Sequence, residues 1–206
     1  MNFLIIGGFL GSGKTSLLLQ LAAYMRDRLG IGKTVILENE IGKVGIDDLV
    51  LSGAGYSVRG MLAGCVCCTM AGELPLTVQA IERELAPEWI IMEATGMAFP
   101  QNVKENLAET LGIDARICCL VDAKRWPRLL KPLEHLLPLQ LKEADAVLIN
   151  KIDLIDESTL ASVRESVAGF CSPDTRIFPV SINNGLGEGI LDRILGRDDR
   201  NSEQTN

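Results

Sequence analysis

The chain has 206 residues, enough for one substantial hydrophobic core and somewhat short for two, and we interpret it as a single domain. Hydrophobic residues make up 47% of it and charged residues 23%, as is typical of a globular α/β protein. Twenty basic residues against 27 acidic ones give a formal charge of −7, which argues against broad binding to nucleic acid or to an anionic membrane.

Short runs rich in Ile, Leu and Val alternate with longer segments of helical periodicity, a pattern that predicts buried parallel strands joined by crossover helices. The predicted strands cover residues 2–7, 34–39, 88–94, 116–123, 145–150 and 176–181. The predicted helices cover residues 14–29, 73–86, 101–112, 133–144, 157–169 and 187–195. We expect an α/β fold with a three-layer, doubly wound, mostly parallel sheet over residues 1–196, followed by a polar tail over 197–206.

The apolar run at the N-terminus, NFLIIG, leads directly into a glycine-rich loop. It is too short and wrongly flanked for a signal peptide or a membrane span, so the sequence predicts a cytoplasmic protein. In a reducing compartment, six cysteines favour metal or redox chemistry over a disulfide framework.

The sequence GFLGSGKT, residues 8–15, fits the pattern G-x-x-x-x-G-K-[ST] between a predicted strand and a predicted helix. Its glycines allow backbone N–H groups to turn toward phosphate oxygens, Lys14 can reach the β- and γ-phosphates, and the Thr15 hydroxyl can bind Mg²⁺. The pattern therefore predicts a phosphate-binding loop made of Gly8, Gly11, Ser12, Gly13, Lys14, Thr15 and Ser16.

The sequence VLINKID, residues 147–153, places three polar residues just beyond a predicted strand, where the crevice of a doubly wound sheet binds ligands. The N-K-x-D pattern of Asn150, Lys151 and Asp153 predicts a guanine pocket. A carboxylate at Asp153 can accept hydrogen bonds from the ring N–H and the exocyclic amine of guanine, and the stem of Lys151 can pack over the base. Ser181, where the last predicted strand ends, is a weaker candidate for covering the other side of the base.

Two further segments concentrate acids near glycines. In IIMEATG, residues 90–96, Glu93 ends an apolar run and is suited to hold Mg²⁺, while Gly96 can offer its N–H to the γ-phosphate. In ENEIGKVGIDD, residues 38–48, we expect Glu40 to couple to the nucleotide or metal and interpret Glu38 and Asp48 as solvated carboxylates.

Three thiols, Cys65, Cys67 and Cys68, lie within four positions of one loop. Thiolates suit Zn²⁺, Co²⁺, Ni²⁺ or Cu⁺, and because zinc prefers four ligands, three thiols leave one position for water, a second subunit or a client. A redox dithiol and buried inert cysteines are the competing interpretations. The inert interpretation leads for Cys118, Cys119 and Cys171, and His135 is expected at a helix surface or edge.

The order of GGFLGSGKTSLL, NEIGKVGID, GCVCCT, EATG, VDA and NKID resembles the CobW family of metallochaperone GTPases, relatives of the nickel-insertion GTPases of urease and hydrogenase maturation. The resemblance implies a P-loop GTPase fold of the SIMIBI type, in which Lys14 and Thr15 bind phosphate and Mg²⁺ while Glu40 and Glu93 couple Mg²⁺ to the switches. It also implies that Asn150, Lys151 and Asp153 read guanine. Asp47 becomes the candidate for orienting the attacking water.

By the same resemblance, Cys65, Cys67 and Cys68 hold the cargo metal, with Zn²⁺ or Co²⁺ favoured. GTP would organise this site, and hydrolysis would hand the ion to a client metalloenzyme or to a cofactor pathway such as cobalamin synthesis. Members of the family usually carry a C-terminal domain, which we do not expect in this chain, and an arginine where Ala71 stands here. No arginine is obviously supplied in cis, which predicts slow turnover.

Two other functions fit parts of the pattern. A GTP-dependent interaction switch would use the cysteines as a structural or redox site, and a small-molecule P-loop kinase would leave them without a role. An incomplete three-thiol site is also compatible with a nucleotide-dependent homodimer.

Overall fold

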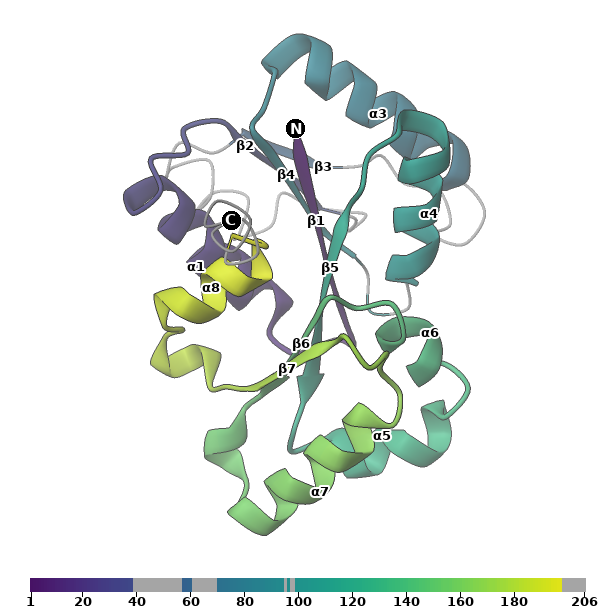
Figure 1. Ribbon diagram of the computed structural model, residues 1–206, viewed down its shortest axis with the longest axis vertical. Helices are drawn as coiled ribbons and strands as arrows, with labels where there is room; N and C mark the ends of the chain where they lie inside the picture. The colour runs from purple at the N-terminus through teal and green to yellow at the C-terminus, as the bar shows by residue number, and fades with distance from the viewer. Residues whose placement is uncertain (39–56, 61–69, 95, 97–98, 198–206) are drawn as a thin grey trace, which may run out of the picture.

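The computed structural model describes residues 1–38, 57–60, 70–94, 96 and 99–197 (Figure 1). Seven strands in these residues form one sheet: β1 Asn2–Gly8, β2 Thr34–Glu38, β3 Ser57–Gly60, β4 Trp89–Glu93, β5 Arg116–Asp122, β6 Ala146–Asn150 and β7 Arg176–Pro179. The helices are α1 Lys14–Asp27, α3 Met70–Leu85, α4 Pro100–Leu111, α5 Trp126–Leu133, α6 Leu137–Leu141, α7 Glu157–Ala168 and α8 Glu188–Ile194. Two short 3₁₀ turns, η1 Ile152–Leu154 and η2 Ile182–Asn184, follow β6 and β7.

The strands lie in the order β3-β2-β4-β1-β5-β6-β7, and each adjacent pair is parallel. Parallel pairing brings the carboxyl ends of all strands to one edge of the sheet, where ligands of this architecture bind. β1 is the central strand, so the loop that follows Gly8 has the loops after β4 and β5 as its neighbours.

Helices cover both faces of the sheet, because alternate residues of each strand point to opposite sides. In β1, Phe3 and Ile5 join the core beneath α3, α4, α5, α6 and α7, whereas Leu4 and Ile6 join the core beneath α1 and α8. Figure 1 shows α1 and α8 together on one side of the sheet and α3, α4 and α6 on the other. Continuous apolar strands are therefore buried on both faces, and the predicted three-layer α/β fold is confirmed.

The strand predictions agree with the structure to within about two residues, but β3 was not predicted. The predicted helix over 133–144 is confirmed only over residues 137–141, which form α6. Residues 134–136 form a turn, and α5, which precedes it, was not predicted. Each of these helices has a proline in its first turn, where the missing N–H costs nothing, and Pro138 would remove a hydrogen bond from the interior of a continuous helix. None of the described helices combines the length and apolar character needed to cross a bilayer.

Candidate nucleotide site

The segment between β1 and α1 has a backbone that requires glycine at three positions, Gly8, Gly11 and Gly13, and the φ angle of Gly11 is 76°. Gly8 and Gly13 have φ angles of 128° and 108°, which residues with a side chain rarely adopt. A Cβ atom at Gly8 would lie 2.4 Å from the carbonyl oxygen of Leu120, and one at Gly13 would lie 2.5 Å from Nδ2 of Asn150. The loop is therefore packed directly against the ends of β5 and β6.

Side chains from those two strand ends bind three successive carbonyl oxygens of the loop. Arg125 Nη1 donates to the Leu10 carbonyl at 2.8 Å and Lys151 Nζ donates to the Gly11 carbonyl at 2.6 Å. Asn150 Nδ2 donates to the Ser12 carbonyl at 2.8 Å. In a trans peptide the N–H points opposite to the C=O, so the amides that follow Leu10 and Ser12 point away from these side chains, as a phosphate cradle requires.

Three predicted residues meet at the start of α1. Lys14 is 7% exposed, with its Nζ 3.8 Å from Oε1 of Glu93, and the Thr15 hydroxyl donates to Oε2 of Glu93 at 3.2 Å. A hydroxyl and a carboxylate oxygen at a helix N-terminus are suitable ligands for Mg²⁺. The hydroxyl of Ser12, also in this loop, is buried and has no hydrogen-bond partner among the described residues, as expected of a group that serves a bound oxyanion. These residues fit a magnesium nucleotide.

The buried amide of Asn150 connects the phosphate loop to the predicted base pocket. Besides donating to the phosphate loop, its Oδ1 accepts hydrogen bonds from the backbone N–H groups of Lys151 and Ile182 at 2.8 and 2.9 Å. Lys151 has a φ of 66°, and its Nζ also contacts Oδ2 of buried Asp122 at 2.8 Å. This ion pair holds the stem of Lys151 beside the loop.

Asp153 lies in η1 with its carboxylate exposed, and it accepts a hydrogen bond from the hydroxyl of Ser181. The segment after Ser181 is fixed by Gln20 of α1, whose side chain donates to the Ile182 carbonyl at 2.6 Å and accepts from the Leu186 N–H at 3.0 Å. The structure therefore brings Asp153 and Ser181 together at the open side of the site.

Gly96, predicted to contact a γ-phosphate, lies against the phosphate loop. A Cβ atom there would be 2.9 Å from the backbone nitrogen of Leu10. Its carbonyl oxygen accepts a hydrogen bond of 2.9 Å from Nε2 of Gln140 in α6.

Ser16, the last residue of the predicted phosphate-binding loop, lies exposed in the first turn of α1. Five predicted site residues lie outside the described residues, namely Glu40, Asp47, Cys65, Cys67 and Cys68, together with most of the 197–206 tail. Among the residues that are described, no group of three or more His, Cys, Asp or Glu side chains is arranged to hold a metal ion.

Three cysteines predicted to be inert are described. Cys118 and Cys119 are fully buried, and this burial raises the pKa of Cys118 to about 12 and that of Cys119 well above its usual range. Burial also raises the pKa of half-buried Cys171 to about 11. Neutral thiols are poor metal ligands, which supports the inert interpretation. His135 lies exposed in the turn between α5 and α6.

Four residues at the site were missed: Gln20, Asp122, Arg125 and Gln140. Asp122 and Arg125 had a usable signal, because they end or closely follow a predicted strand on the ligand-binding edge of the sheet. Gln140 had none, since a glutamine within a predicted helix does not reveal a contact with Gly96.

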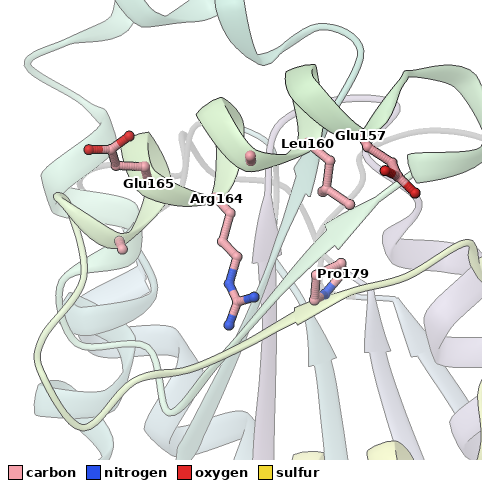
Figure 2. Close-up of a pocket in the computed structure, with 7 residues that line it drawn as sticks. Glu157, Leu160, Arg164, Glu165 and Pro179 are labelled. Carbon is pink, nitrogen blue, oxygen red and sulfur yellow. The ribbon is translucent and has the colours of Figure 1, made fainter.

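A groove of about 480 Å³ lies elsewhere, between α7 and β7. Figure 2 shows Leu160 and Arg164 pointing from α7 toward the strand, where Pro179 lies, and Glu165 pointing away. Among the described residues, those that line this groove include none that we predicted to bind the nucleotide.

Comparison with known proteins identifies relatives over nearly all of the chain. The model of the nucleotide-binding domain of CobW/HypB/UreG matches residues 2–179. The chain is 33% identical to a zinc chaperone CobW of Sinorhizobium sp over 224 aligned residues, covering 93% of this chain and 61% of the relative. It is 30% identical to a zinc-regulated GTPase metalloprotein activator 1 of Schizosaccharomyces pombe over 175 residues, covering 79% of this chain and 42% of the relative. The chain thus spans about three fifths of the CobW relative.

Solved structures share the fold at low sequence identity. HypB from Archaeoglobus fulgidus superposes with a TM-score of 0.67 at 18% identity, covering 95% of this chain and 89% of that one. HypB from Helicobacter pylori in complex with nickel has a TM-score of 0.63 at 21% identity, covering 98% and 88%. The signal recognition particle receptor FtsY of Elizabethkingia anophelis has a TM-score of 0.61 at 16% identity, covering 94% and 65%. The P-loop NTPase fold is therefore shared with this group.

Proposed function

Because the chain belongs to the CobW/HypB/UreG family of nucleotide-binding domains, we propose that it binds and slowly hydrolyses GTP and couples the nucleotide state to a thiolate metal site. The observation that carries the nucleotide part is the junction at Asn150. This one buried amide bonds both the phosphate loop and the segments that carry Asp153 and Ser181, so the two halves of a guanine nucleotide site are held together.

Magnesium would be held by Thr15 and Glu93, with Glu40 as a further candidate. When bound, the ion supplies charge neutralisation to the phosphates. Lys14 adds the fixed positive charge that the phosphates need, and its burial beside Glu93 keeps the ammonium group at the loop. Asp47 remains the candidate for orienting the attacking water.

The cargo metal would be held by Cys65, Cys67 and Cys68. The described thiols do not compete for this role, because burial raises the pKa of Cys118, Cys119 and Cys171. Zinc is the first choice, since two relatives bear zinc in their names. Cobalt and nickel also suit thiolate ligands. The acceptor of the ion would be a client metalloenzyme or cofactor-synthesis protein in a reducing compartment, and a second copy of this chain is one way to complete a three-thiol site.

A titration of the reduced chain with Co²⁺ and Zn²⁺ tests the proposal. It compares protein with Mg²⁺ and GDP, protein with Mg²⁺ and a non-hydrolysable GTP analogue, and the variants Cys67→Ser and Cys171→Ser. We expect the analogue to tighten metal binding at least fivefold, which is within the usual range of coupling between sites. The Co²⁺ thiolate absorption should vanish in Cys67→Ser and persist in Cys171→Ser.

If the metal affinity is the same with either nucleotide, the proposed coupling is wrong, and the chain is better described as a GTP-dependent switch with a structural zinc site. Absence of metal binding would remove the metallochaperone function. Turnover faster than about 1 s⁻¹ without partner or metal would contradict the expected slow hydrolysis.

A further inference from the structure

Gly96 is held between two parts of the fold. On one side its α-carbon faces the phosphate loop so closely that a Cβ atom would lie 2.9 Å from the Leu10 nitrogen and 3.5 Å from the Phe9 carbonyl carbon. On the other side its carbonyl oxygen accepts the 2.9 Å hydrogen bond from Nε2 of Gln140. The position of this glycine therefore depends on a side chain 44 residues away in sequence.

Gln140 is itself fixed to the sheet. It is 3% exposed and lies on the buried face of α6 with Leu137 and Leu141. Its own backbone carbonyl accepts a hydrogen bond from the Cys119 thiol at 3.0 Å. Cys119 pairs in β5 with Gly7 of β1, immediately before the phosphate loop, so Gln140 and the loop are anchored to adjacent residues of the same two strands.

Gln140 is a polar side chain on the buried face of α6, where an apolar residue would be expected. Its neighbours in the helix are leucines, and an apolar residue would be buried there without any polar group to satisfy. Glutamine requires hydrogen-bond partners in exchange for its lost hydration, and the Gly96 carbonyl is one of them. The contact at Gly96 is thus the specific consequence of having glutamine at position 140.

We infer that Gln140 is a positioning residue that holds Gly96 against the phosphate loop and thereby sets the preference for a nucleoside triphosphate over a diphosphate. The inference rests on the proposed GTP site. Glycine has the largest backbone freedom of any residue, so without the bond to its carbonyl the peptide units around Gly96 gain alternative orientations. The Gly96 N–H would then be presented to the terminal phosphate in only part of the population, whereas a diphosphate does not use this contact.

The experiment measures the dissociation constants of Mg²⁺-GDP and of a Mg²⁺-bound non-hydrolysable GTP analogue on the full chain. The variant Gln140→Leu removes the hydrogen bond, and Gln140→Met does the same while keeping the unbranched shape. The matched control is Gln20→Leu, which removes another glutamine bond to a loop carbonyl, that of Ile182 at 2.6 Å, on the base side of the site.

We expect both Gln140 variants to weaken binding of the analogue roughly three- to tenfold, as loss of one hydrogen bond predicts, and to change GDP binding less than about twofold. Gln20→Leu should weaken both nucleotides by the same factor. Equal effects on the two nucleotides in the Gln140 variants, or no effect on either, overturn the inference. So does failure of both variants to fold, judged by circular dichroism, because the role of Gln140 is then structural. Wild-type protein that binds neither nucleotide would instead refute the proposed function.

Discussion

The side chain of Asn150 donates a hydrogen bond of 2.8 Å to the backbone carbonyl of Ser12, which lies 138 residues earlier in the chain. Its Oδ1 accepts from two backbone N–H groups of the base-side loops. One buried amide therefore fixes the spacing between the β1–α1 loop and the loops that we propose hold the base.

Replacing Asn150 with alanine should loosen both halves of the site together. Three backbone groups lose their hydrogen-bond partner, and each buried unsatisfied group costs about 1–3 kcal/mol. Because solvent will satisfy some of these groups, we expect the free energy of unfolding to fall by about 2–4 kcal/mol in total. GDP and GTP affinity should fall at least about tenfold. Urea unfolding and nucleotide titration measure these effects, with Asn183→Ala, exposed in the neighbouring turn η2, as the control. A variant of native stability and affinity would contradict the role of this amide.

Asp153→Asn should change the choice of base. A carboxylate offers two acceptors to the ring N–H and amine of guanine. An amide offers one acceptor and one donor, which match the ring N–H and the neighbouring carbonyl oxygen that xanthine has in place of the amine. We expect GTP affinity to fall by about a hundredfold or more and xanthosine triphosphate to become the better ligand. Competition binding of the two nucleotides to wild type and variant measures the change. Retained preference for GTP would mean that Asp153 does not read the base.

Glu93→Gln should weaken the dependence of nucleotide binding on Mg²⁺. The carboxylate accepts from the Thr15 hydroxyl and lies 3.8 Å from Lys14 Nζ, so its neutralisation removes a hard anionic oxygen from the predicted magnesium site. We expect the Mg²⁺ concentration that half-saturates GTP binding to rise about tenfold or more. The exposed Glu73→Gln in α3 serves as the charge-matched control. An unchanged Mg²⁺ dependence would remove Glu93 from the metal site.

Two of the six thiols should stay unreactive in the native protein. Burial raises the pKa of Cys118 to about 12 and that of Cys119 well above its usual range, so neither forms appreciable thiolate between pH 7 and about 9, where an ordinary thiol of pKa about 8.5 ionises. When the protein is titrated with a disulfide reagent at pH 8, Cys118 and Cys119 should react only after denaturant is added. Complete reaction without denaturant would show that the β5 core opens readily.

The sequence was most informative where one local segment determines the structure. Parallel strands buried on both faces appear as continuous aliphatic runs, whereas β3 has Val58 as its one aliphatic residue and gave no such run. The motif residues Lys14, Thr15 and Asn150 were predicted because the chemistry of phosphate and base binding fixes their spacing. Gln140 acts through a contact to Gly96 that depends on how distant elements pack, which no local pattern records.

Three successive carbonyls of the phosphate loop accept hydrogen bonds from Arg125, Lys151 and Asn150. These bonds lower the entropy that the loop would lose when a ligand binds. They orient the peptide units of the loop during folding, so the ordering cost is met by the fold and not by the incoming nucleotide. A loop ordered in this way has little left to change between a triphosphate and a diphosphate. In the GTPase that we propose, the signal that separates the two ligands would then originate beyond the loop, in segments that touch the last phosphate alone.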